Sequence, residues 1–201
     1  MLQLDHIAVA CGTLEAGRAH VEAALGVQMV AGGRHAVFGT HNLLLGLEDG
    51  LYLEVIAVDP DAPPPGRARW FDLDRFSGPP RLSNWICRTG DIAEAPPEAG
   101  PPVALERGDL RWRMAVPEDG RLPFDQLFPA VIAWEGMAHP AARLPRSGVR
   151  LRRLTLTHPR AAALNAALAG RILDDRVAVA QGAAARLTAE FDTPHGPRVL
   201  R

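Results

Sequence analysis

The stretch Leu2–Ala10 (LQLDHIAVA) decides the fold of this chain, because it is a short apolar strand with a histidine, His6, in its middle. Side chains alternate between the two faces of a strand, so His6 lies on the face opposite Ile7. A second apolar strand, Leu51–Val58 (LYLEVIAV), carries a carboxylate, Glu54, in the same way. These two polar side chains can converge only if the two strands are neighbours in one sheet.

The residues between these strands complete a βαβββ unit over residues 1–58. Thr13 is suited to cap the N-terminus of an amphipathic helix, and Gly26 is suited to end it. The other expected features are a strand at Val27–Val30, a turn at Gly32-Gly33, a strand at His41–Leu47 and a tight turn at Asp49-Gly50.

The same order of elements is expected twice more. A Pro-rich connector, residues 59–81, carries four large apolar groups around Trp70-Phe71 and is expected to hold a short docked helix. A second, degenerate βαβββ module follows at 82–135, and a third at 150–201. No such unit can bury its sheet face alone, so the modules are expected to pack into one α+β unit.

Composition excludes several function classes. The net charge is −1 without a basic block, which argues against nucleic acid as a partner. No apolar run is long enough to span a membrane, and two cysteines are too few for a disulfide framework, so a cytoplasmic protein is expected. The chain has no P-loop, no dinucleotide fingerprint opening a helix and no nucleophile elbow.

Several motifs resemble the glyoxalase-like domain family of the vicinal oxygen chelate superfamily. They are LDHIAVA (4–10), GGRH (32–35), GTHN (39–42), YLEV (52–55), Trp70-Phe71, IAWEG (132–136) and His139-Pro140. The resemblance covers nearly the whole chain, strongest in residues 2–56 and loosest in 150–201. It implies βαβββ modules that form a curved mixed sheet around a cleft.

The resemblance also implies metal ligands from the first and fourth strands of each module. In the first module these positions are His6 and Glu54, whose open coordination positions would face substrate oxygens. In the second module the first-strand position is Asn84, and the fourth is Trp134 or Glu135, depending on a one-residue choice of register. The implied cofactor is a divalent metal (Zn, Mn, Fe, Ni or Co) on His6, Glu54 and Glu135; a metal-free site is the alternative.

Other side chains are candidates for substrate binding or catalysis. Asn42 is expected beside His6 and Glu54 as a hydrogen-bonding group for substrate. His35, in a turn over the mouth of the cleft, is a candidate base or lid residue, or a plain surface histidine. The remaining candidates, each with a structural alternative, are Trp134 as an aromatic wall and Arg111 and Arg113 as a pair for an anionic substrate.

These residues support two main functional hypotheses. The first is a small-molecule enzyme of lyase, isomerase or dioxygenase type, acting on adjacent oxygens, with Glu54 and His35 as catalytic groups. The second is a metal-free protein that binds or sequesters a small molecule in the same cleft. A third hypothesis is an interaction protein whose sheet edges pair into a homodimer. Fold resemblance cannot choose among these, because function depends on the site.

Overall fold

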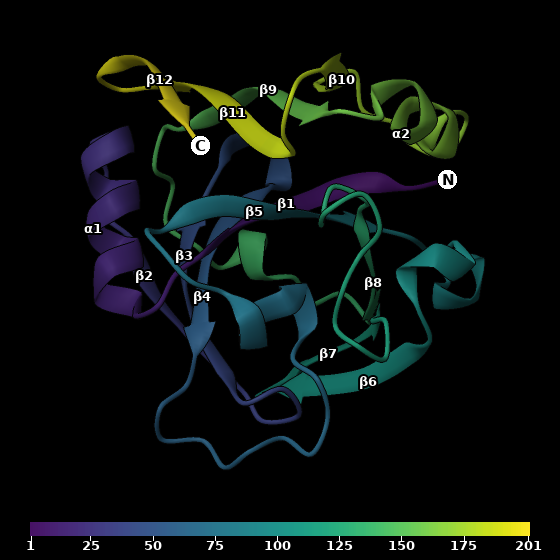
Figure 1. Ribbon diagram of the computed structural model, residues 1–201. Helices are drawn as coiled ribbons and strands as arrows, with labels where there is room; N and C mark the ends of the chain where they lie inside the picture. Colours follow the sequence, from purple (N-terminus) through teal and green to yellow (C-terminus); the bar gives the residue numbers. More distant parts are fainter.

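The computed structural model describes residues 1–201 and consists of two sheets (Figure 1). The larger sheet is strongly curved, and its two edge strands, β2 and β6, contact each other. Its eight strands are, in spatial order, β2 (Val30–His35), β3 (Thr40–Gly46), β4 (Tyr52–Val58), β1 (Gln3–Ala10), β5 (Arg81–Arg88), β8 (Ala130–Glu135), β7 (Leu110–Ala115) and β6 (Pro102–Arg107).

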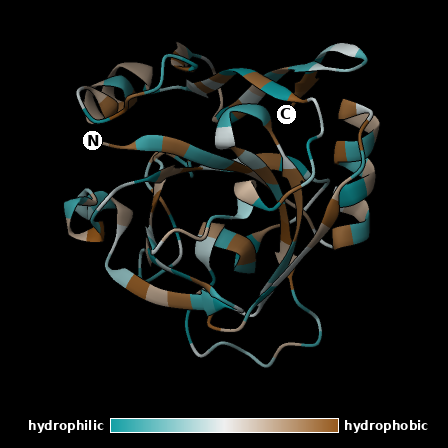
Figure 2. Ribbon diagram, turned by 180° about the vertical axis from the view of Figure 1, so that it is seen from behind, coloured by the Kyte–Doolittle hydropathy of each residue, from teal (hydrophilic) through white to brown (hydrophobic).

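The first two modules share one pattern of strand pairing. In each module the first strand pairs in parallel with the fourth, β1 with β4 and β5 with β8. The two modules join where β1 pairs antiparallel with β5. This arrangement confirms the expected α+β fold and makes β1 a central strand. Its residues from Leu4 onward are buried on both faces, and hydrophobic residues run along the strands that flank it (Figure 2).

Helix α1 (Leu14–Leu25) covers the outer face of the first module. The hydroxyl of Thr13 accepts a hydrogen bond from the backbone of Ala16 and caps the helix, which ends at Gly26 in the left-handed conformation. A Cβ at Gly17 would lie 2.3 Å from Val55 Cγ1, so the helix backbone rests directly on β4. The face of β4 that carries Glu54 therefore points the other way, into the curve of the sheet.

The glycine pair in the first module does not form the expected turn. Gly32 and Gly33 lie within β2, at an irregularity in its pairing with β3, and the turn follows at residues 36–39. The physical reason is space, because a Cβ at Gly32 would lie 2.0 Å from Asn42 Oδ1. These glycines allow close approach of side chains within the sheet rather than a change of chain direction.

The C-terminal segment has the expected element order but a different strand pairing. Its strands form a separate sheet in the order β10-β9-β11-β12, so the first strand lies between the second and the third. This layer packs on the outside of the main sheet through contact of β11 with β5 (Figure 1). Its elements are β9 (Arg150–His158), α2 (Ala161–Leu168), β10 (Val177–Gln181), β11 (Arg186–Thr193) and β12 (Gly196–Leu200).

Short 3-10 helices complete the fold, and one of them is the helix expected in the connector. This helix, η2 (Trp70–Arg75), buries Trp70 and Phe71. The others are η1 (Glu48–Gly50), η3 (Ile92–Glu94), η4 (Pro97–Ala99) and η5 (Pro140–Ala142). None of the helices is long and apolar enough to span a bilayer.

Candidate active site

His6 and Glu54 meet inside the curve of the large sheet, as the two strand patterns predict. The parallel pairing places His6 beside Tyr52 and Glu54 beside Ala8, on neighbouring strands. His6 Nε2 and Glu54 Oε2 are 3.7 Å apart, and both residues are only 5% exposed. No protein hydrogen bond occupies either atom, so both are available to a molecule between them.

A β-bulge brings Asp5 to the same side as His6. Adjacent residues of a regular strand point to opposite faces, but the register between β1 and β5 shifts between Leu4 and His6. As a result, Asp5 Oδ1 lies 2.7 Å from His6 Nδ1. This carboxylate accepts a hydrogen bond from Nδ1 and orients the ring so that Nε2 faces Glu54 Oε2.

Asp5 is fully buried and is held ionised by its hydrogen-bond donors. Its second oxygen, Oδ2, accepts from Trp134 Nε1 at 3.1 Å and from His139 Nε2 at 3.0 Å. Burial by itself raises the pKa of Asp5, but the hydrogen bonds from His139 and His6 outweigh burial and hold that pKa well below its usual range. Asp5 is therefore a fixed negative charge behind the His6 imidazole.

Asn42 holds the other oxygen of Glu54. Its Nδ2 donates to Glu54 Oε1 at 2.6 Å, while its Oδ1 accepts from the backbone of Gly33 at 2.8 Å. The expectation that Asn42 lies beside His6 and Glu54 is confirmed. Its amide is already engaged by the protein, so its effect on a ligand acts through the position of Glu54.

Arg107 reaches this cluster from the far edge of the sheet. Its Nη1 donates to Asn42 Oδ1 and to His35 Nε2, each at 3.2 Å, which links β6 to β2. Its Nη2 and Nε make no hydrogen bond with the protein. The site thus contains a guanidinium that sequence reasoning did not identify.

His35 is a buried neutral histidine rather than a turn residue over an open mouth. It ends β2 with 4% exposure, and its Nδ1 lies 3.0 Å from Thr40 Oγ1. Burial, assisted by the charge of Arg107, lowers the pKa of His35 to about 3. Its Nε2 therefore accepts hydrogen bonds from Arg107 and Asn42 and positions them.

These polar groups line a small inner cavity of about 30 Å³, close to the volume of one water molecule. Tyr52 stacks on the His6 ring at 4.3 Å, and burial raises the pKa of its phenol well above the usual value. The remaining walls are apolar and are formed by Leu44, Trp70, Phe71, Trp112, Met114, Ile132 and Trp134. Trp134, an expected aromatic wall, is therefore part of this cavity.

Three other predicted site residues lie elsewhere. Arg111 and Arg113 are exposed on β7, on the face opposite Trp112. Glu135 is exposed at the end of β8, where Oε1 accepts from Arg113 Nε at 3.1 Å. The side-chain alternation that turns Trp134 inward turns Glu135 outward, so Glu135 is not beside His6 and Glu54.

The structure also corrects the position equivalent to Glu54 in the second module. Ala8 pairs with Glu54 in the first module, and Ile86 pairs with Ala130 at the equivalent register in the second. Ala130 has no donor atom, and Asn84 directs its Nδ2 to Gln126 Oε1 rather than into the inner cavity.

The residues present do not fit a resident divalent metal. His6 and Glu54 supply two donors, whereas zinc sites use three or four protein ligands and non-haem iron sites three. No group of three or more His, Cys, Asp or Glu side chains is arranged to hold an ion. Arg107, a cation in the same cluster, also opposes a bound cation.

The paired βαβββ modules, with polar groups inside a curved sheet, define a glyoxalase-like fold. Residues 4–172 match the family described as glyoxalase-like domain, and this chain belongs to that family. No curated protein matches it.

Solved structures resemble this chain in fold at low sequence identity. A hypothetical protein from Staphylococcus aureus has 14% identity and a TM-score of 0.65, and the match covers 92% of this chain and 88% of that one. Methylmalonyl-CoA epimerase from Mycobacterium tuberculosis has 19% identity and a TM-score of 0.43 over 69% of this chain and 91% of that one. A variant of the Streptomyces coelicolor epimerase, in complex with 2-nitronate-propionyl-CoA, has 19% identity and a TM-score of 0.44 over 69% and 100%.

Proposed function

We propose that this chain is a small-molecule enzyme that transfers a proton next to a carbonyl group, using Glu54 and His6 as its acid–base pair. The observation that supports this proposal most directly is the 3.7 Å separation of Glu54 Oε2 and His6 Nε2, two free acid–base atoms in a buried aromatic cavity. A low dielectric around such a pair strengthens its interaction with charge that develops in a substrate.

The proposed step is enolisation of a carbonyl compound that has an oxygen on the adjacent carbon. Glu54 Oε2 accepts the proton from that carbon, the electron pair of the broken C–H bond forms the new C=C bond, and the π pair of the carbonyl moves to its oxygen. Arg107 stabilises the enolate, and His6 moves a proton between the two oxygens. Return of the proton from Glu54 to the former carbonyl carbon gives the isomer.

The supporting residues keep this pair in position. Asp5 fixes the tautomer and orientation of His6, and Asn42 fixes the carboxylate of Glu54. We propose that His35 is a positioning residue for Arg107 and not the base, since its burial keeps it neutral and its Nε2 already accepts a hydrogen bond.

Hydrogen–deuterium exchange tests the proposal even while the product is unidentified. Chelator-treated protein in D₂O would be incubated with 2-hydroxyaldehydes and 2-hydroxyketones, and deuterium incorporation at carbon would be followed by NMR. We expect at least one class to exchange, with a loss of about 10²–10⁴-fold in Glu54→Gln.

The exchange assay, together with a melting-temperature measurement, distinguishes the alternative functions. Exchange that requires added Zn, Mn, Fe, Ni or Co, and is lost with His6→Ala, would support a metalloenzyme. A compound that raises the melting temperature but never exchanges would support a binding or sequestering protein.

A further inference from the structure

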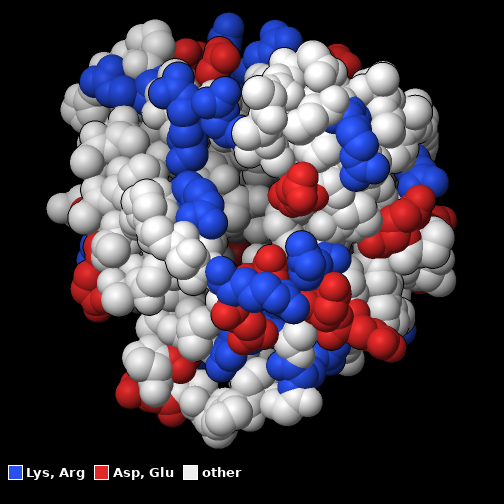
Figure 3. All heavy atoms as spheres, in the orientation of Figure 1, with Lys and Arg blue, Asp and Glu red and all other residues white.

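A second, larger cavity opens on the surface next to the inner one. This outer cavity has a volume of about 430 Å³ and is formed by η2, the start of β5, the loop at residues 125–127 and β11. The surface is visibly hollowed in the middle of the face shown in Figure 3, with basic side chains along part of its rim. It is large enough for a small organic molecule, which the inner cavity is not.

Phe71 is the wall between the two cavities. It lines both the inner and the outer cavity and also packs on Trp70 with ring centroids 5.4 Å apart. Phe71 and Asp72 both have positive φ, 59° and 55°, which is unfavourable for residues other than glycine. A molecule in the outer cavity therefore lies one side chain away from Glu54 and His6.

The outer cavity has an excess of positive charge. Four arginines and two aspartates line it, and the aspartates are already paired: Asp72 with Arg75, and Asp125 with His158 at 3.1 Å. Most arginines of this chain pair with a carboxylate, but Arg81, Arg186 and Arg201 line the cavity without one. Four arginines against two aspartates leave an excess of positive charge on the lining.

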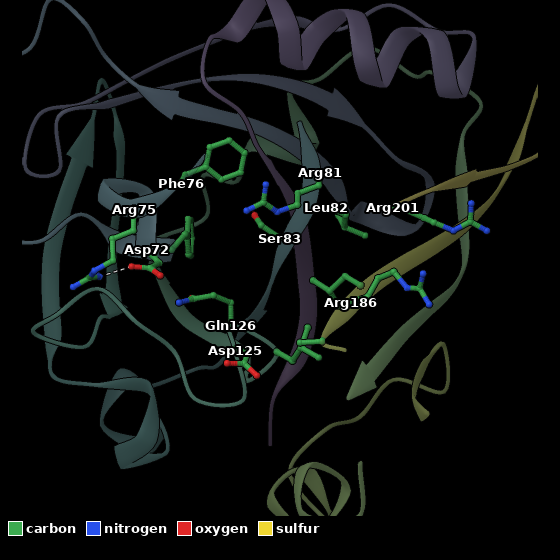
Figure 4. Close-up of a pocket in the computed structure, with 14 residues that line it drawn as sticks. Asp72, Arg75, Phe76, Arg81, Leu82, Ser83, Asp125, Gln126, Arg186 and Arg201 are labelled. Carbon is green, nitrogen blue, oxygen red and sulfur yellow. Dashed lines mark hydrogen bonds and ion pairs between the residues drawn. The ribbon is translucent and has the colours of Figure 1, made fainter. Parts of the chain in front are cut away.

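Arg81 is the best positioned of these arginines. Its guanidinium lies 4.3 Å above the Phe76 ring, and its Nη1 donates to the backbone oxygen of Ser77 at 2.8 Å. These contacts fix the guanidinium and leave Nε and Nη2 free. In Figure 4, Arg81 and Ser83 lie together on one side of the cavity, and Arg186 and Arg201 extend along another.

The remaining walls of the outer cavity are apolar, and one of them is formed by the C-terminal layer. Phe71, Phe76, Leu82 and Leu187 offer contacts for the body of a ligand. Leu187 and Arg186 belong to β11, which lies outside the residues that match the family, 4–172. This wall of the outer cavity therefore comes from residues beyond the family match.

We infer that the outer cavity binds an organic anion, a phosphate or carboxylate attached to an apolar body, through Arg81 and Arg186. This inference rests on the proposed function to the extent that the anion is one end of the substrate. The other end of that substrate would enter the inner cavity when Phe71 moves aside. Guanidinium groups match the geometry of carboxylates and phosphates, which makes arginine the usual residue for recognising such anions.

Fluorescence titration with 8-anilinonaphthalene-1-sulfonate (ANS), an aromatic sulfonate, tests the inference. We expect saturable binding of one ANS per chain, at least about tenfold weaker in the double variant Arg81→Gln/Arg186→Gln. The matched control, Arg153→Gln/Arg198→Gln, removes the same charge from two arginines that have no acidic partner and lie outside the cavity. It should bind ANS as the wild type does.

Competition identifies the anion class. Displacement of ANS by inorganic phosphate but not by acetate indicates a phosphate group, and the reverse indicates a carboxylate. No saturable ANS binding by the wild type, or equal binding by the Arg81→Gln/Arg186→Gln variant, would overturn the inference.

The two proposals fail separately. ANS binding is measured without turnover and should be unchanged in Glu54→Gln, so it is independent of the acid–base pair. Unchanged deuterium exchange in Glu54→Gln contradicts the proposed reaction, whereas unchanged ANS binding in the arginine variant contradicts only the anion site.

Discussion

Asp5 and His6 are adjacent in one strand, yet their side chains form a hydrogen bond of 2.7 Å between Oδ1 and Nδ1. Only the bulge between Leu4 and His6 makes this contact available, because a regular strand would direct the two side chains to opposite faces. The bulge therefore converts a lone histidine into an oriented acid–base group.

Asp5→Asn should destabilise the protein by about 3 kcal/mol at pH 7, since it removes a buried charge that three hydrogen-bond donors face. The pKa of Asp5 is lowered in the folded state, so its contribution is fully present above the unfolded value of about 3.9 and is lost as the pH falls below it. Urea unfolding of both proteins at pH 7 and pH 3 measures the difference. A gap that stays constant across this range would contradict the role of an ionised Asp5.

His35→Gln should make the stability less dependent on pH. Because the pKa of His35 is about 3 in the folded protein, the unfolded chain binds a proton below about pH 6.5 that the folded chain does not. Wild-type stability should fall by up to about 1.4 kcal/mol per pH unit from this group between pH 6 and pH 4. Unfolding curves at several pH values test this, with His195→Gln, at an exposed histidine, as the control.

Gly32→Ala should cost about 1–3 kcal/mol and disturb the site, because the new Cβ would lie 2.0 Å from Asn42 Oδ1. Gly90→Ala is the matched control, since no atom lies within 4 Å of a Cβ there. Its free energy of unfolding should change by less than about 0.5 kcal/mol. Equal effects of the two substitutions, measured by chemical denaturation, would argue against the close packing of Gly32 on Asn42.

Arg111→Gln/Arg113→Gln should leave the deuterium-exchange rate within about twofold of wild type, since both side chains are exposed on the outer face of β7. The measurement is the exchange assay on the compound that the screen identifies. A large loss of exchange would support the expectation that these two arginines bind an anionic substrate.

Periodicity in the sequence was sufficient to find part of the site. His6 and Glu54 interrupt otherwise apolar strands, and Asn42 follows the same alternation, so their convergence is predictable. Asp5 was missed because alternation assigns it to the opposite face, and a bulge leaves no signal in the sequence. Arg107 was missed because it ends a hairpin strand of the second module, and only closure of the sheet brings β6 to β2.

The expectations that were wrong concern register and strand partners. Glu135, expected as a metal ligand, is the residue next to Trp134. A shift of one residue in strand register moves every side chain of the strand to the opposite face of the sheet. The C-terminal segment has the expected strands and helix, but hydrophobic pattern locates strands without saying which of them pair. Gly32-Gly33 looked like a turn because glycine favours turns, and the need for space beside Asn42 and Arg107 is a tertiary effect. The expected homodimer stays a prediction.

The most direct test of the account is the deuterium-exchange rate of metal-free Glu54→Gln beside the wild type. Glutamine keeps an acceptor for Asn42 but cannot accept a proton at this position, so the fold should persist and the rate should fall about 10²–10⁴-fold. A wild-type rate in Glu54→Gln would show that Glu54 is not the base and would contradict the proposed reaction.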